Sequence, residues 1–386
     1  MAATVITGIG ELTTNESEFG TLADAALVFE GDRIVWVGPS GNAPDADEHI
    51  DVEGRAVLPG WVDSHTHLVF AGDRTAEFAD RMAGRPYQAG GIAVTVEATR
   101  RATDDELAHN LRRHVREAAA QGTTCLETKT GYGLTVADEL RAAKIAADHV
   151  DEVTFLGAHL VPSGAEAADY VDLVSGDMLD AVADHVGWCD VFCEEGAFDV
   201  DQSRRVLTEA RRRGLGLRVH GNQLGPGPGV GLAVELGAAS VDHCTHLEPT
   251  DIDALGGSGT VATLLPACDL STRQPLPDAR ALLEAGATVA LASNCNPGSS
   301  YTSSMAFCVT TAVLQMRMSV AEAVRAATWG GARALRRESG DGAVGALRPG
   351  ARADLQVLDA PSATWLAYRP GVPLTHAVWS KGARVR

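Results

Sequence analysis

The sequence predicts an α/β fold, a (β/α)8 TIM barrel with a small composite β-sandwich domain built from both termini. Eight short apolar runs alternate with segments of helical periodicity in the middle of the chain, and strand-like segments without that alternation stand at both ends. We place the composite domain at 1–56 and 344–386 and the barrel at 57–343. A doubly wound open sheet is the alternative fold, because periodicity does not prove the order of strands.

Eight apolar runs are the candidate barrel strands. Parallel strands covered by helices are buried on both faces and therefore read as continuous apolar runs. The runs lie at 57–63, 123–127, 153–158, 189–194, 215–220, 239–243, 261–266 and 288–293. Thr103 with Glu106, and Ser319 with Glu322, have the spacing of a capping box and predict two helix starts between the runs. Gly122 predicts a helix end.

The terminal segments have a different character. Apolar runs at 25–29 and 33–37 flank Glu30, Gly31 and Asp32, which predicts a β-hairpin. At the other end, 345–358 and 377–386 hold short strand-like runs broken by Gly and Pro. Two such ends around a long middle predict one composite domain.

Composition limits the partners and the location of the protein. No apolar stretch reaches eighteen residues and the first residues lack a basic region with an apolar run, so we expect a cytoplasmic protein. The formal charge is 32 minus 51, or −19, which argues against nucleic acid and membrane surfaces and leaves a small-molecule substrate. The seven Cys include no C-x-x-C pair, so we expect reduced thiols, with Cys295 in a packing role rather than as a nucleophile.

Four histidines stand at the ends of predicted strands. His65 and His67 follow the first run and, two residues apart, point to the same side. His220 and His243 end two further runs. Because the carboxyl ends of barrel strands meet at one face, where barrel active sites lie, these imidazoles converge and can bind a divalent ion. A His-x-His pair alone is a weak signal, and the convergence of four strengthens it.

Longer motifs carry a family resemblance. The segment LPGWVDSHTH (58–67) resembles the signature of the amidohydrolase superfamily, and KTGYGL (129–134) with NPGSS (296–300) is similar to the imidazolonepropionase family within it. The resemblance covers nearly the whole chain. It implies hydrolytic ring opening of 4-imidazolone-5-propanoate to N-formimidoyl-L-glutamate in histidine degradation. It also implies one divalent or trivalent metal ion, with zinc favoured and iron as the alternative, and a homodimer.

The resemblance also implies roles for individual residues. His65, His67 and His220 match the metal ligands, and the fourth ligand falls at Asn294. His243 matches the histidine that assists proton transfer, and Gln223 falls beside it in the catalytic group. The positions that match substrate contacts are Arg74, Tyr132, His159 and Gln223, and those that match product contacts are Asn296, Gly298 and Ser299. In a protein of charge −19, an arginine that grips the propionate with two parallel hydrogen bonds is what an anionic substrate requires.

Asn294 departs from the family pattern, which has aspartate there. An amide coordinates weakly and cannot act as a base near pH 7, so we expect impaired activity. A substitution introduced to trap a complex, an enzyme that relies on His243 as its base, and a natural protein that has lost activity are three explanations. The first is favoured because the other site positions match. Two other functions stay open: a heterocycle deaminase with the same histidines, and an inactive homologue that binds substrate without turnover.

Overall fold

Eight parallel strands form the barrel predicted from the sequence. The computed structural model describes residues 2–18, 20–85 and 91–386, so residues 1 and 19 of the expected composite domain lie outside it. Neighbours in the sequence are neighbours in the sheet, from β6 to β13. The strands are β6 (Trp61–Asp63), β7 (Thr123–Lys129), β8 (Glu152–Ala158), β9 (Trp188–Cys193), β10 (Gly216–Gly221), β11 (Ser240–His243), β12 (Val261–Leu264) and β13 (Val289–Leu291).

The first and last barrel strands meet just beyond their carboxyl ends. Thr66 and Cys295 form a parallel bridge. The amide of His67 donates to the carbonyl of Cys295 (2.9 Å), and the amide of Asn294 donates to the carbonyl of His65 (3.0 Å). These contacts join the two edges of the sheet and confirm the barrel. They also hold three of the predicted site residues on adjoining backbones.

The first predicted strand is divided in the structure. We predicted one strand over 57–63, but β5 (Ala56–Pro59) pairs with β1 and β14 in the terminal sheet, and only β6 belongs to the barrel. Gly60 separates them, and a Cβ atom there would lie 2.1 Å from Oγ1 of Thr124. The chain therefore passes from one sheet to the other where it needs the smallest residue.

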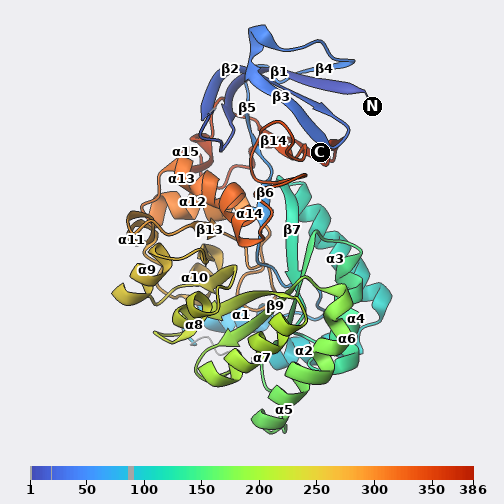
Figure 1. Cartoon of the computed structure of the whole chain (residues 1–386), viewed down its shortest axis with the longest axis vertical. Coiled ribbons are helices and arrows are strands. Elements are labelled where there is room, and N and C mark those ends of the chain that lie inside the picture. Colours follow the sequence, from blue (N-terminus) through green and yellow to red (C-terminus); the bar gives the residue numbers. More distant parts are fainter. Residues whose placement is uncertain (1, 19, 86–90) are drawn as a thin grey trace.

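Helices cover the outside of the barrel (Figure 1). The predicted capping boxes at Thr103 and Ser319 are both formed, at the starts of α3 and α13. Gly122 follows α3 with φ of +99° and confirms the predicted end. In the part of the chain that is described, no helix is long and apolar enough to cross a membrane. The helices are α1 (Thr75–Met82), α2 (Ile92–Arg101), α3 (Asp104–Ala119), α4 (Val136–Ala147), α5 (Ala167–Leu173), α6 (Leu179–Val182), α7 (Val200–Arg212), α8 (Gly229–Glu235), α9 (Pro249–Gly256), α10 (Pro266–Thr272), α11 (Ala279–Glu284), α12 (Met305–Gln315), α13 (Val320–Arg325), α14 (Gly331–Ala334) and α15 (Trp365–Tyr368).

Segments from both ends of the chain form a second sheet, above the barrel in Figure 1. Its order is β16-β15-β14-β5-β1-β2-β3, with β4 against β1. The predicted hairpin is confirmed, since Glu30 pairs with Arg33 around a two-residue turn. Ile6, Leu27 and Trp379 belong to a core separate from that of the barrel. The strands are β1 (Ala3–Thr13), β2 (Thr21–Glu30), β3 (Arg33–Pro39), β4 (Glu48–Asp51), β5, β14 (Leu355–Leu358), β15 (Thr375–Ser380) and β16 (Ala383–Arg384).

All seven cysteines are free and buried. Burial raises the pKa of the Cys295 thiol above its ordinary value, and the nearby Asp63 raises it further. A buried thiol with a raised pKa is a poor nucleophile. The structure therefore supports the packing role expected for Cys295.

Candidate active site

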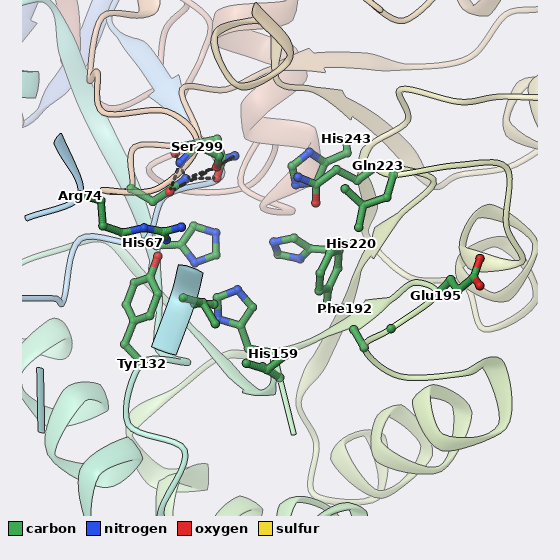
Figure 2. Close-up of a pocket in the computed structure, with 17 residues that line it drawn as sticks. His67, Arg74, Tyr132, His159, Phe192, Glu195, His220, Gln223, His243 and Ser299 are labelled. Carbon is green, nitrogen blue, oxygen red and sulfur yellow. Dashed lines mark hydrogen bonds between the residues drawn. The ribbon is translucent and has the colours of Figure 1, made fainter. Parts of the chain in front are cut away.

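A cavity of about 330 Å³ opens at the carboxyl ends of the barrel strands (Figure 2). It is lined by every predicted site residue except His65 and Gly298. His65 is fully buried, and Gly298 lines a neighbouring cavity that shares Arg74 with the first. In Figure 2, Arg74 and Tyr132 lie on one side of the histidines and Gln223 on the other. The lining residues predicted from the sequence are His67, Arg74, Tyr132, His159, His220, Gln223, His243, Asn294, Asn296 and Ser299.

The imidazoles cluster tightly. Ligand atoms of His65, His220 and His243 all lie within 4.8 Å of one another, so the histidine expected to move protons is part of the cluster. His67 joins through His65, with 3.2 Å between the two Nε2 atoms. Burial lowers the pKa of His65, His67 and His243 well below the ordinary value, and the crowding of basic groups around each ring adds to the effect. These rings are therefore neutral near pH 7 and carry lone pairs that can bind a cation.

The donor set fits a metal ion. Several imidazole nitrogens that face one another in a buried site suit zinc or iron. The Nδ1 atoms of His67, His220 and His243 make no hydrogen bond with the described residues, although Nδ1 of His220 lies 3.0 Å from a carboxylate oxygen of Asp190. Asn294 is less suited, because its side-chain oxygen already accepts from Nδ2 of Asn296 at 3.1 Å. His243 and Asn294 both have positive φ, +85° and +52°, a strained conformation typical of functional sites.

Two buried carboxylates lie next to the Nδ1 atoms of two of the histidines. Nδ1 of His65 is 2.6 Å from Oδ2 of Asp242, and Nδ1 of His220 is 3.0 Å from Oδ2 of Asp190. Burial alone would raise the pKa of both carboxyls. Nearby basic groups reverse this, chiefly Arg218 for Asp242, and the His220 ring with the Lys129 ammonium for Asp190, so both pKa values lie below the ordinary range. Such partners orient metal-binding imidazoles.

Sequence reasoning missed these carboxylates and the cations between them. Lys129 lies 3.0 Å from Glu127 and 2.9 Å from Asp190, and all three side chains are fully buried. Each charge stands in or beside a run that we predicted as a buried strand. A charge in such a strand must be paired, and that signal could have found the network.

Arg74 is already paired at the mouth of the cavity. Its Nε donates to Oε2 of Glu77 at 2.8 Å and its Nη2 to Oε1 at 2.7 Å. Glu77, one turn along α1, was not anticipated. A Cβ atom on Gly298 would lie 2.1 Å from Nη1 of Arg74, so the absence of a side chain at Gly298 leaves room for the guanidinium.

Buried carboxylates also hold the loops that carry site residues. Glu139 accepts hydrogen bonds from the amides of Gly131, Gly133 and Leu134 at 2.7 to 2.9 Å, which fixes the loop of Tyr132. In the same way Glu194 accepts from the amides at residues 223 and 224. Neither role was predicted from the sequence. The hydrogen-bond partners of Glu194 lie on another element, and those of Glu139 lie in the loop that precedes its helix.

The loop after β13 is held by its own side chains. Oδ1 of Asn296 accepts from the amides of Gly298 (2.9 Å) and Ser299 (2.8 Å), and its Nδ2 donates to the carbonyl of Asn294 (2.6 Å). His159 is anchored at the opposite wall, where its Nδ1 lies 2.9 Å from the carbonyl of Gly131. Burial lowers the pKa of His159 to about 4, so this ring is neutral and can hydrogen-bond an uncharged heterocycle.

Comparison with known proteins extends this picture. Residues 56–383 match the model of the amidohydrolase family. The chain is 81% identical over 385 residues to imidazolonepropionase of Saccharopolyspora erythraea, covering 100% of this chain and 99% of the relative. It is 65% identical over 402 residues to imidazolonepropionase of Paenarthrobacter aurescens, covering 100% and 98%.

Solved structures share the fold. The zinc complex of atrazine chlorohydrolase from Arthrobacter aurescens superposes with a TM-score of 0.73 at 20% identity, covering 99% of this chain and 94% of that one. A zinc-bound adenosine deaminase from Xanthomonas campestris gives 0.74 at 20% identity, covering 99% and 92%. The full-length identity and the match to the family model agree with the motifs around the histidines. The chain therefore belongs to the amidohydrolase family and, within it, to the imidazolonepropionases.

Proposed function

We propose that the protein hydrolyses 4-imidazolone-5-propanoate to N-formimidoyl-L-glutamate, the ring-opening reaction implied by the name of its relatives. The observation that carries the proposal is that one cavity is lined both by histidines of the cluster and by a buried arginine, Arg74. His65, His67 and His220 are the proposed ligands of one metal ion, zinc in the first instance and iron as the alternative, with Asn294 at the fourth position. When bound, the ion would acidify a water molecule and polarise the ring carbonyl.

The side chains around the ion supply orientation and proton transfer. Hydrolysis adds the hydroxyl of water to the ring carbonyl carbon and a proton to the leaving ring nitrogen, and the bond between these two atoms breaks. His243 is buried and neutral, so it can accept the proton of water and return it to the nitrogen. Gln223, which lies beside His243 in Figure 2 and lines the same cavity, is the proposed hydrogen-bond partner of the reacting groups.

The remaining residues hold the substrate in place. Arg74 binds the propionate, and its pairing with Glu77 leaves the guanidinium preorganised in one position. Tyr132 and His159, whose rings lie 5.5 Å apart, orient the imidazolone ring. Asn296, Gly298 and Ser299 are proposed to contact the opened product, with Asn296 acting mainly by shaping the loop.

An absorbance assay tests the proposal directly. The purified, metal-loaded protein should remove the imidazolone absorbance without releasing ammonia, whereas a heterocycle deaminase would release ammonia in its first step. Arg74→Gln should lower kcat/KM by about 100-fold, since it removes charge-assisted hydrogen bonds worth about 1.5 to 3 kcal/mol each. Arg85→Gln, which removes the same charge from an exposed position, is the matched control. Binding without turnover would instead identify an inactive homologue.

Assembly and location are part of the same proposal. The family resemblance supports a homodimer that works in the cytoplasm, with the composite domain at 1–56 and 344–386 and the barrel at 57–343. Sedimentation of the purified chain tests the dimer.

A further inference from the structure

A buried ion network lies behind the histidine cluster. The ammonium of Lys129 is 3.0 Å from Oε1 of Glu127, 2.9 Å from Oδ2 of Asp190 and 3.8 Å from Oδ2 of Asp242. Arg218 is the other cation, with Nη2 3.3 Å from Oδ2 of Asp242. All five side chains are fully buried. The three carboxylates outnumber the two cations, so removal of either cation would leave more uncompensated negative charge in a buried site.

Each aspartate of this network also faces a histidine. Oδ2 of Asp190 is the atom nearest to Lys129 and lies 3.0 Å from Nδ1 of His220, while Oδ1 accepts from the amide of His220 at 3.1 Å. Oδ2 of Asp242 is 2.6 Å from Nδ1 of His65. A neutral imidazole has one N–H, and a carboxylate close to Nδ1 favours the N–H at that atom, which leaves the lone pair on Nε2, on the other side of the ring.

We propose that Lys129 is a positioning residue for the metal site: its ammonium holds Asp190, and with Arg218 holds Asp242, so that His220 and His65 present Nε2 to the ion. The inference rests on the proposed function, which requires the ion. Asp242 pairs with two cations, Lys129 and Arg218. Among the ion pairs of the described residues, the Lys or Arg partner of Asp190 is Lys129 alone. Removal of the Lys129 charge therefore affects His220 more than His65.

Zinc binding to the full chain tests the inference without any turnover. Lys129→Met keeps most of the length of the side chain and removes its charge. It should weaken zinc binding 10- to 100-fold in competition with a chromophoric chelator, the range found when partners of metal-binding histidines are removed. Lys144→Met removes the same charge from the exposed side of α4 and should leave zinc affinity unchanged.

A charge-balanced pair of variants guards against failure to fold. Glu127 pairs with Lys129 and its Oε2 accepts from the amide of Thr66 at 3.1 Å, so its own substitution is the reference, and Lys129→Met/Glu127→Gln removes one charge of each sign. Compared with Glu127→Gln alone, the double variant should lose the same 10- to 100-fold in zinc affinity. Equal zinc affinity in these two variants would overturn the inference.

A spectroscopic measurement separates positioning from a general structural role. In the zinc-free protein, the assigned ¹⁵N signals of His220 should report Nδ1–H in the wild type and a changed tautomer balance in Lys129→Met. Unchanged His220 signals together with weakened zinc binding would refute the positioning role. The two proposals can fail separately. If the wild-type protein does not hydrolyse imidazolone propionate but Lys129→Met still weakens zinc binding, the proposed reaction is overturned and this inference stands.

Discussion

Asn294→Asp restores the family carboxylate and is expected to raise the hydrolysis rate. The substitution is nearly isosteric, and Oδ1 would keep the hydrogen bond from Nδ2 of Asn296, now 3.1 Å long. The substitution removes the hydrogen bond from Nδ2 of Asn294 to Oγ of Ser299, which is 3.5 Å long and therefore weak. The Ser299 hydroxyl can rotate to donate to the new carboxylate. Little rearrangement of the loop is needed.

The size of the effect follows from the chemistry that the carboxylate adds. A general base contributes about 100- to 10,000-fold to rate, which corresponds to about 2.7 to 5.4 kcal/mol of transition-state stabilisation. We expect the lower end, because His243 already offers a neutral nitrogen beside the same cavity. The new charge is buried, since Asn294 is 2% exposed, so the metal-free variant should be less stable than the metal-free parent.

Two measurements check this pair of effects. Steady-state loss of imidazolone absorbance should show a rise in kcat of about 100-fold, and thermal unfolding should show a larger gain in Tm on adding zinc for the variant than for the parent. Comparable rates in the two forms would refute the reasoning, because the amide would then do all that a carboxylate can do at this position.

Three further predictions concern other parts of the molecule. Gly298→Ala should displace Arg74 and lower kcat/KM by about tenfold, whereas Gly231→Ala, where an added Cβ meets nothing within 4 Å, should not; equal effects in both would contradict the predicted clash. Burial raises the pKa of Asp269 to about 7, partly opposed by Thr245. Because this folded-state pKa lies above the unfolded value near 3.9, the stabilisation from protonation is fully present below about pH 4 and is lost as pH rises through about 7. Over this range the free energy of unfolding should fall by up to about 4 kcal/mol relative to that of Asp269→Asn. Urea unfolding of both proteins at several pH values checks this prediction, and a constant difference between them would refute it. Loading the metal-free protein with zinc at 100 times Kd should raise the free energy of unfolding by about 2.7 kcal/mol, and an unchanged Tm would exclude a site formed only in the folded chain.

Much of the barrel followed from local patterns in the sequence. A buried parallel strand leaves a continuous apolar run, and a helix start leaves a capping pair such as Thr103 with Glu106, so both can be read from a few neighbouring residues. The carboxyl ends of such strands meet at one face. That rule alone predicts the convergence of His65, His220 and His243, which the structure confirms.

Contacts between distant elements were decided only by the tertiary structure. The division of the first strand at Gly60 depends on a close approach to Thr124 on the next barrel strand. The partners of Asp190 and Asp242 depend on which side chains face each other across the barrel interior, because a charge attracts every opposite charge and distance alone selects among them. The sequence by itself determined where the histidines emerge. The fold decided which charges lie behind them, since those pairings join strands far apart in the chain.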